Sequence, residues 1–386
     1  MPSPTPSPAG LSPTPPTAAE AYAQIRAAVE QLRGLQPTAA VEPVTIDAAQ
    51  LRSNLEAEFD RAHTPASLAN TEGLLIALGL LPAGASLRAL TLDFQAGQVA
   101  GYYSPEQGEL FVVNRSGGLG AVELVTYAHE FTHQLQDQRI GLDSLGLDVA
   151  DQSDRSLARL AVVEGDATSV QTTWMTANLD PHQLGQLLGS ALDPASLEAF
   201  QRAPAFLRDT ALFPYQDGLA FVSRLVALGG YARVDAAYAD PPDSTEQILH
   251  PNTYLDREPP IEATVPDGLA GTLGAGWSEA ARDTLGELIL RIWLRAGDVS
   301  AAAARTAASG WGGDRVALFR GPDGATSVLL RTAWDTADDA DEFATAARSA
   351  LTALGLEAAL GHVAGTARVD IAVGGQAAQL VAALRG

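Results

Sequence analysis

The sequence predicts a helix-rich α+β protein, and three patterns support this prediction. Apolar side chains recur at spacings of three and four residues in long segments such as 121–138, as in amphipathic helices. Residues 98–114 have two strand-like runs around a Ser-Pro-Glu-Gln-Gly turn, which indicates a β-hairpin. Strand-like and helical segments then alternate after the Pro- and Gly-rich stretch that ends near residue 276, which predicts a second, smaller α+β unit.

The chain divides by composition into three parts. Residues 1–19 are a Pro/Ser/Thr-rich tail that cannot bury a core, so we expect them to be disordered. Residues 20–270 form the larger predicted domain and residues 271–386 the smaller one. In the larger domain, helices are expected at residues 18–35, 47–63, 64–81, 121–138, 156–175, 181–211 and 217–238, with strands near 41–46, 99–103 and 109–113.

The smaller unit carries no recognisable chemistry. Its predicted helices are residues 278–295, 299–309, 336–354 and a last one at the C-terminus, and its predicted strands are 316–320, 327–332 and 367–373. The segment Gly310–Arg315 (GWGGDR) is interpreted as a turn that sets the entry of a strand. Asp314 and Asp335 suggest a site there only weakly.

Composition excludes several functional classes. The net charge of −22 argues against nucleic-acid binding and against anionic membrane surfaces, since both require basic residues. The chain has no cysteine, so any metal must be held by nitrogen and oxygen ligands. No apolar run is long enough for a transmembrane segment, and no export signal is visible. Because Pro/Ser/Thr tracts commonly tether exported domains, we expect a secreted or surface-tethered protein.

The most informative motif is His129-Glu130-Phe131-Thr132-His133, an HExxH pattern inside a predicted helix. Positions i and i+4 share a helix face, so His129 and His133 can bind one ion, and Glu130 lies close enough to act on a water. Because a buried helix has little reason to carry unpaired ionisable groups, a zinc site is favoured over a chance match. The pattern therefore predicts zinc-assisted hydrolysis with Glu130 as general base.

A catalytic zinc needs a third protein ligand, and Glu164 is the best candidate. A third histidine in the same motif is excluded because Gln136 and Arg139 occupy the relevant positions. Glu164 lies on an otherwise apolar face of the helix expected at 156–175, and Gly165 beside it would allow another helix to approach closely. The alternatives are a salt bridge from Glu164 to Arg159 and a solvated position. Asp166 points away from this face, and Asp137 is either a group that orients a histidine or a surface residue.

HEFTH followed by Val162-Val163-Glu164-Gly165-Asp166-Ala167 resembles the gluzincin group of zinc metallopeptidases, in particular secreted bacterial members whose second motif is E-G-x-A. The resemblance covers roughly residues 95–255. It implies a zincin-like catalytic domain, one zinc per chain held by His129, His133 and Glu164, Glu130 as the base, and a polypeptide substrate. It also implies that the hairpin strand before the HExxH helix borders the cleft and pairs with an extended peptide, although a hairpin that packs only on the core is equally compatible with the sequence.

Peptide hydrolysis also needs a donor for the developing oxyanion. The segment 241–254 is rich in turn residues and carries His250, which is the favoured donor, with Tyr215 and Tyr254 as alternatives. Ser244 and Thr245 are also compatible with a plain helix start.

The sequence thus predicts a zinc metallopeptidase. Two alternatives stay open: a non-catalytic binding module on the same scaffold, and a zinc hydrolase that acts on a non-peptide substrate. Pairing of a peptide with the hairpin would favour the peptidase, whereas a small closed pocket would favour the second alternative. The sequence does not indicate the oligomeric state.

Overall fold

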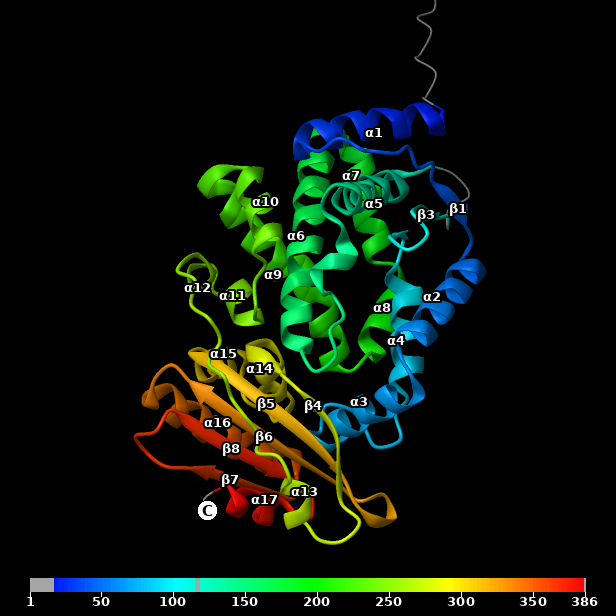
Figure 1. Cartoon of the computed structure of the whole chain (residues 1–386). Helices are drawn as coiled ribbons and strands as arrows, with labels where there is room; N and C mark the ends of the chain where they lie inside the picture. The colour runs from blue at the N-terminus through cyan, green and yellow to red at the C-terminus, as the bar shows by residue number, and fades with distance from the viewer. Residues whose placement is uncertain (1–16, 115–118, 385–386) are drawn as a thin grey trace, which may run out of the picture.

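The computed structural model describes residues 17–114 and 119–384, and it confirms a helix-rich α+β protein (Figure 1). The helices are α1 Ala18–Arg33, α2 Ala48–Ala62, α3 Pro65–Ala77, α4 Leu87–Gln98, α5 Ala121–Ile140, α6 Ser153–Asn178, α7 Pro181–Ala191, α8 Pro194–Arg202, α9 Ala205–Gly229, α10 Tyr231–Ala239, α11 Thr245–Leu249, α12 Pro251–Leu255, α13 Leu269–Thr272, α14 Gly286–Ala296, α15 Ala301–Ala308, α16 Ala337–Leu354 and α17 Ala377–Ala383. The strands are β1 Val44–Ile46, β2 Gly101–Ser104, β3 Glu109–Val113, β4 Ser278–Asp283, β5 Trp311–Arg320, β6 Thr326–Trp334, β7 Ala358–His362 and β8 Arg368–Val373.

Most of the predicted tail, residues 1–16, lies outside the described residues. The remaining tail residues are ordered, because Thr17 caps α1 and Ala18 begins it. None of the helices in the described part of the chain combines the length and the apolar composition that crossing a bilayer requires.

The predicted hairpin and the short strand before it form a small mixed sheet in the order β1-β3-β2, with β1 parallel and β2 antiparallel to β3. Strand β2 is therefore an edge strand, and it packs beside α5. The N–H of Val113 donates to the carbonyl of Ala100 at 2.9 Å, which fixes the alternation of hydrogen bonds along the hairpin. Hydrogen-bonded and non-hydrogen-bonded residue pairs alternate along an antiparallel pair of strands. The N–H and C=O groups of Gly101 and Tyr103 therefore point away from β3.

Helices α5 and α6 lie in the interior of the larger part of the molecule. The carboxylate of Glu123 accepts a hydrogen bond at 2.9 Å from the N–H of Gly120, and this cap begins α5. Gly141, with φ 81°, ends the helix. The central residues of α5 are buried on every face, including the whole HEFTH motif. The ionisable residues of that motif thus need partners within the protein or a bound ligand.

Helices α6 and α9 approach each other closely, as the presence of Gly165 suggested. A Cβ on Gly165 would lie 2.3 Å from the backbone of Gly218, and one on Gly218 would lie 2.2 Å from the carbonyl oxygen of Ala161. Only glycine fits at either position, so this contact places α9 directly against the Glu164 helix. The expected break between helices at residues 181–211 and 217–238 was wrong, because α9 begins at Ala205 and continues through Pro214 to Gly229.

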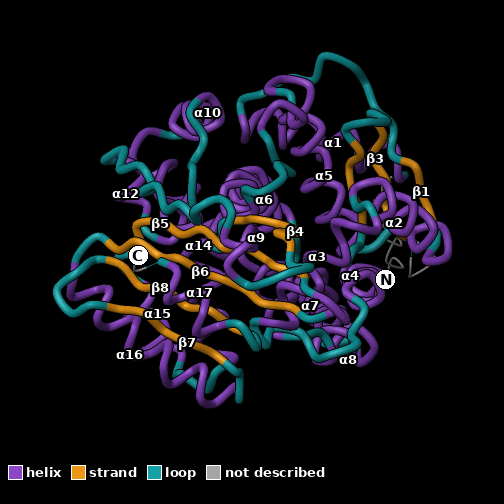
Figure 2. Tube along the Cα trace, turned by 60° about the horizontal axis from the view of Figure 1, so that its bottom comes forward, coloured by secondary structure: helices purple, strands orange, loops and turns teal. Residues whose placement is uncertain are grey.

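The C-terminal sheet is antiparallel, in the order β4-β5-β6-β8-β7 (Figure 2). Side chains alternate along its strands, so one face carries Val316 and Leu318 and packs against α14 and α16. The other face carries Ala317 and Phe319 and packs against α13 and α17. Both faces are thus covered by helices.

Two predictions for this region were wrong in detail. Residues 278–283 were expected to be helical but form β4, since pairing with β5 overrides the helix propensity of Ser-Glu-Ala-Ala-Arg. Gly310–Arg315 was expected to be a turn, but β5 begins at Trp311. Asp314 accepts hydrogen bonds from the N–H groups of Leu285 and Gly286, so it stabilises the start of α14. Strand β7 and helix α4 were not predicted.

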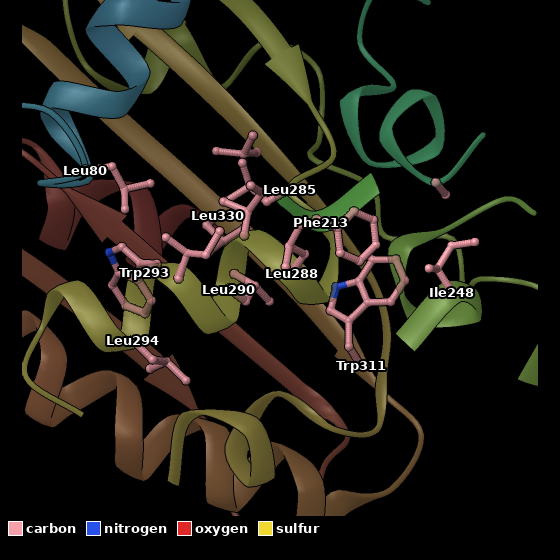
Figure 3. Packing of buried hydrophobic residues seen from close by; sticks show 14 of the residues in the cluster. Leu80, Phe213, Ile248, Leu285, Leu288, Leu290, Trp293, Leu294, Trp311 and Leu330 are labelled. Carbon is pink, nitrogen blue, oxygen red and sulfur yellow. The ribbon is translucent and has the colours of Figure 1, made fainter. Parts of the chain in front are cut away.

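The two predicted units share one hydrophobic cluster. Phe213 of α9 and Ile248 of α11 belong to the same cluster as Leu288 of α14 and Leu330 of β6 (Figure 3). Helix α14 therefore joins the helical part to the C-terminal sheet, and α3 also packs directly on β5 and β6. Two residues after Phe213, the same helix carries Tyr215, whose ring lies beside His129 of the HEFTH helix.

Candidate metal centre

His129 and His133 of α5 and Glu164 of α6 converge on one point. Nε2 of His129 lies 3.0 Å from Nε2 of His133 and 3.1 Å from Oε2 of Glu164, and the distance from His133 Nε2 to the same oxygen is 3.3 Å. All three donor atoms lie within 4.8 Å of one another. Bond lengths of 2.0–2.1 Å around a tetrahedral ion place ligand atoms about 3.3 Å apart, so the three side chains fit a single metal ion.

Glutamine side chains orient both imidazoles toward this point. Nδ1 of His129 lies 2.7 Å from Oε1 of Gln171, and Nδ1 of His133 lies 2.8 Å from Oε1 of Gln136. An amide oxygen can only accept, so each Nδ1 carries the proton and each Nε2 presents a lone pair. This is the arrangement in which a histidine binds a metal through Nε2, with its other nitrogen held by a neighbouring acceptor.

The electrostatics of the cluster favour a cation. Burial would raise the pKa of the Glu164 carboxyl, but His133 and His129 outweigh it and hold that pKa below its ordinary value. Burial would lower the pKa of His133, but Glu164 outweighs it and raises this pKa to about 9. A positive charge among the three side chains thus stabilises them, and a metal ion can supply that charge in place of a proton.

Glu130 lies beside the cluster on the same helix. Burial raises the pKa of its carboxyl, and the nearby His129 and His133 offset part of that rise. The carboxylate also accepts a hydrogen bond from the backbone N–H of Tyr103 in the edge strand. Glu130 therefore faces the space between α5 and β2, and it is more basic than an exposed glutamate.

Tyr215 of α9 completes this group. Its ring lies 6.0 Å from that of His129, at an angle of 30°. Burial of the hydroxyl and the charges of Glu164 and Glu130 raise the pKa of Tyr215 well above its ordinary value, and its hydroxyl hydrogen-bonds to Glu164. The residue as a whole is 43% exposed, which indicates that the ring is accessible while the hydroxyl is enclosed. The hydroxyl thus stays protonated and can donate a hydrogen bond.

Most of these residues, but not His133, line one cavity of about 530 Å³. Its polar wall holds His129, Glu130, Glu164, Gln171 and Tyr215, and the edge-strand residue Gly101 borders it. The rest of the wall is mainly apolar and includes Phe94, Val99, Val125, Leu160, Phe200, Leu212 and Pro214. Polar reactive groups thus lie at one side of a hydrophobic cavity, as is typical of enzyme sites.

The structure places the other candidate donors elsewhere. His250 hydrogen-bonds to Glu287 at 3.1 Å and lines a separate cavity of about 580 Å³ with Arg291. The hydroxyl of Tyr254 donates to the carbonyl of Asp240 at 2.9 Å. His250, which the sequence favoured, is therefore not brought to the His129 group, and Tyr215 is.

The sequence interpretation missed the groups that orient the histidines. Asp137 accepts a hydrogen bond from the hydroxyl of Tyr103 at 2.9 Å and contacts neither histidine. Gln136 was considered only as the residue that rules out a third histidine, yet it orients His133. Its spacing of three residues from His133 on one helix face was the available signal.

Part of the chain is similar to a known protein family. Residues 273–385 match a family described as "Domain of unknown function (DUF8575)". No curated protein and no solved structure is significantly similar to the chain. The match covers the C-terminal sheet and the helices around it, and it does not reach the residues of the candidate metal centre.

Proposed function

We propose that the protein is a zinc-dependent peptidase, with His129, His133 and Glu164 as zinc ligands and Glu130 as general base. The observation that carries the proposal is the convergence of the two imidazoles and the carboxylate beside Glu130, in a cavity bordered by the edge strand β2. A nitrogen–nitrogen–oxygen ligand set suits zinc. When bound, the ion would lower the pKa of a water molecule and polarise the scissile carbonyl.

Glu130 would take a proton from the water as the water oxygen attacks the carbonyl carbon. As the carbon–nitrogen bond breaks, the same carboxyl would pass that proton to the leaving amine. The raised pKa of Glu130 suits both steps, because its basicity is closer to neutral pH than that of an exposed glutamate.

The edge strand β2 supports a peptide substrate over a small molecule. Gly101 borders the cavity, and its peptide groups point away from β3, so an extended substrate can add to the sheet. A side chain on Gly101 would meet the carbonyl oxygen of Phe111 at 2.6 Å, so a glycine here keeps the strand in place beside Glu130.

The experiment that tests this proposal measures metal content and proteolysis together. Zinc is quantified by mass spectrometry in purified protein, and cleavage of denatured casein is followed before and after treatment with a chelator. We expect one zinc per chain, loss of cleavage in the chelated protein and recovery on addition of zinc. Zinc without cleavage of any peptide would favour a binding module or a hydrolase of other substrates, and a protein that takes up no zinc would overturn the proposal.

Tyr215 is proposed as the oxyanion donor, and Tyr215→Phe tests this role. Removal of one such donor costs about 10²–10³-fold in kcat, so we expect a loss of that size with zinc content unchanged. Tyr254→Phe is the matched control, since this hydroxyl bonds to Asp240 away from the cavity. Equal activity of the two variants in a fluorogenic peptide assay would exclude Tyr215 as the donor.

A further inference from the structure

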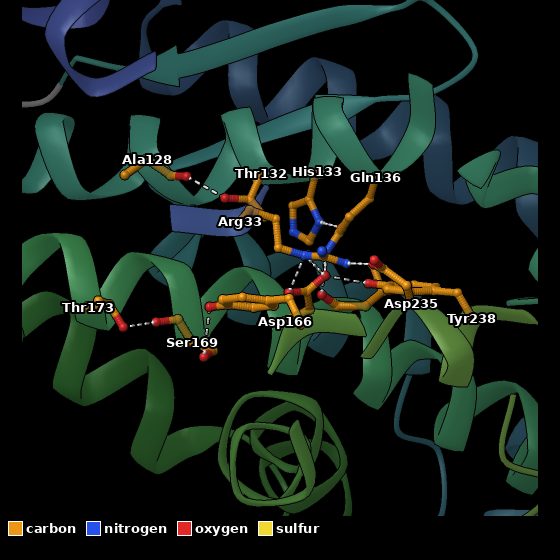
Figure 4. Close-up of polar contacts among 12 residues, drawn as sticks. Arg33, Ala128, Thr132, His133, Gln136, Asp166, Ser169, Thr173, Asp235 and Tyr238 are labelled. Atoms are coloured by element: carbon orange, nitrogen blue, oxygen red, sulfur yellow. Dashed lines mark hydrogen bonds and ion pairs between the residues drawn. The ribbon is translucent and has the colours of Figure 1, made fainter. Parts of the chain in front are cut away.

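A buried polar network lies behind His133, on the side away from the cavity (Figure 4). It begins at Gln136, whose side chain is fully buried. The amide nitrogen of Gln136 donates to the carbonyl of Val163 at 3.0 Å and to Asp166 Oδ2 at 3.1 Å. Both partners are acceptors, so the amide nitrogen must face them and the amide oxygen must face His133. Asp166 thus determines, through the orientation of Gln136, that Nδ1 of His133 carries the proton.

Asp166 is in turn held by residues of two other helices. Arg33 of α1 donates through Nε to both carboxylate oxygens at 2.9 Å, and neither side chain has any exposed surface. The hydroxyl of Tyr238 of α10 donates to Asp166 Oδ2 at 3.0 Å. With Gln136, three donors surround one carboxylate, so its position is fixed tightly.

Arg33 is itself anchored. Nη2 of Arg33 donates a hydrogen bond to Asp235 at 2.6 Å, and the guanidinium lies 4.9 Å from the centre of the Tyr231 ring. Burial would lower the pKa of Arg33, but Asp166 and Asp235 outweigh it and raise this pKa above its ordinary value. Arg33 is the last residue of α1, which packs on α5 and α6, so the network ties that helix to the candidate metal centre.

We propose that Arg33 is a positioning residue for the metal centre: it holds Asp166, which fixes Gln136 and through it the tautomer and orientation of His133. This inference rests on the proposed zinc site. The proposed role makes zinc affinity depend on the docking of α1, although α1 lies more than 90 residues before the HEFTH motif in the sequence. His129 differs, because within the described residues no hydrogen bond joins its partner Gln171 to α1.

The test compares Arg33→Met with Arg26→Met. Arg26 also lies on α1 and also contacts α5, through the hydroxyl of Tyr127 at 3.2 Å, but it has no connection to His133. Zinc dissociation constants are measured by competition with a chromophoric chelator, and melting temperatures are recorded with and without zinc. Loss of groups that orient metal ligands typically costs 10–100-fold in affinity. We expect a loss in that range for Arg33→Met and less than about twofold for Arg26→Met.

The outcomes separate this inference from the proposed function. A wild-type protein that takes up no zinc overturns both. If the wild type binds zinc and Arg33→Met binds it with unchanged affinity, only the role of Arg33 is overturned. This holds even if the zinc-free and zinc-loaded forms of the variant both melt at a lower temperature than those of the wild type. Where Arg33→Met does not fold, Arg33→Met/Asp166→Leu removes both buried charges and is better tolerated. We expect the same loss of zinc affinity in that double variant, and unchanged affinity there would also overturn the proposal.

Discussion

Glu130→Gln is expected to reduce peptide cleavage by about 10²–10⁴-fold, the range that general-base catalysis contributes. The glutamine side chain has the same shape, but it cannot take the proton of the attacking water or return it to the leaving amine. Zinc binding is expected to persist, because the proposed ligands are His129, His133 and Glu164 and do not include Glu130. The measurements are kcat/KM on a fluorogenic peptide and zinc content of the same preparation.

Glu123→Gln is the matched control on the same helix. Its carboxylate accepts from the N–H of Gly120 and caps the start of α5, away from the cavity. This variant is expected to lose some stability while it keeps wild-type kcat/KM per folded molecule. Cleavage that survives Glu130→Gln at wild-type rate would show that another group acts as the base, or that the hydrolysis comes from a contaminant.

The sequence was a good guide to the convergence of His129, His133 and Glu164 where the information is local. The HExxH spacing places two histidines on one helix face whatever the rest of the fold does. Glu164 required one more step, since its position depends on how α6 packs on α5. The apolar stripe around it indicated which way that helix face points. Gly165 indicated that another helix could approach closely, and the structure shows that this helix is α9.

The sequence was a poor guide where contacts join distant segments. Nothing local in residues 241–254 shows that Glu287 binds His250 at the far side of α9, so a loop histidine was preferred over Tyr215. The contact between Arg33 and Asp166 spans 133 residues and involves two ordinary helices. Likewise β4 has a helical composition, and only its pairing with β5 makes it a strand. Local pattern therefore predicted which ionisable side chains converge, but it could not predict the residues that hold them in place.

Glu164→Ala is expected to abolish zinc binding at micromolar zinc, which separates the ligand role from an ordinary ion pair. The variant keeps both histidines but offers only two protein ligands, and a stable site needs at least three. If zinc binds as proposed, the metal at 100 times its dissociation constant would stabilise the folded wild type by about 2.7 kcal/mol, because it would bind the native protein in preference to the unfolded chain. The variant should gain no such stabilisation, which melting curves with and without zinc measure directly.

Asp137→Ala is the matched acidic control, since Asp137 lies one turn after His133 but bonds to Tyr103 instead of the histidines. It should bind zinc as the wild type does. If Glu164→Ala retained one zinc per chain and its zinc-dependent rise in melting temperature, Glu164 would only form ion pairs with the histidines, and a different third ligand would be required. Loss of zinc in both variants would instead point to a general disturbance of α5. Loss in Glu164→Ala alone assigns the ligand, because the two changes remove the same charge within the same pair of packed helices.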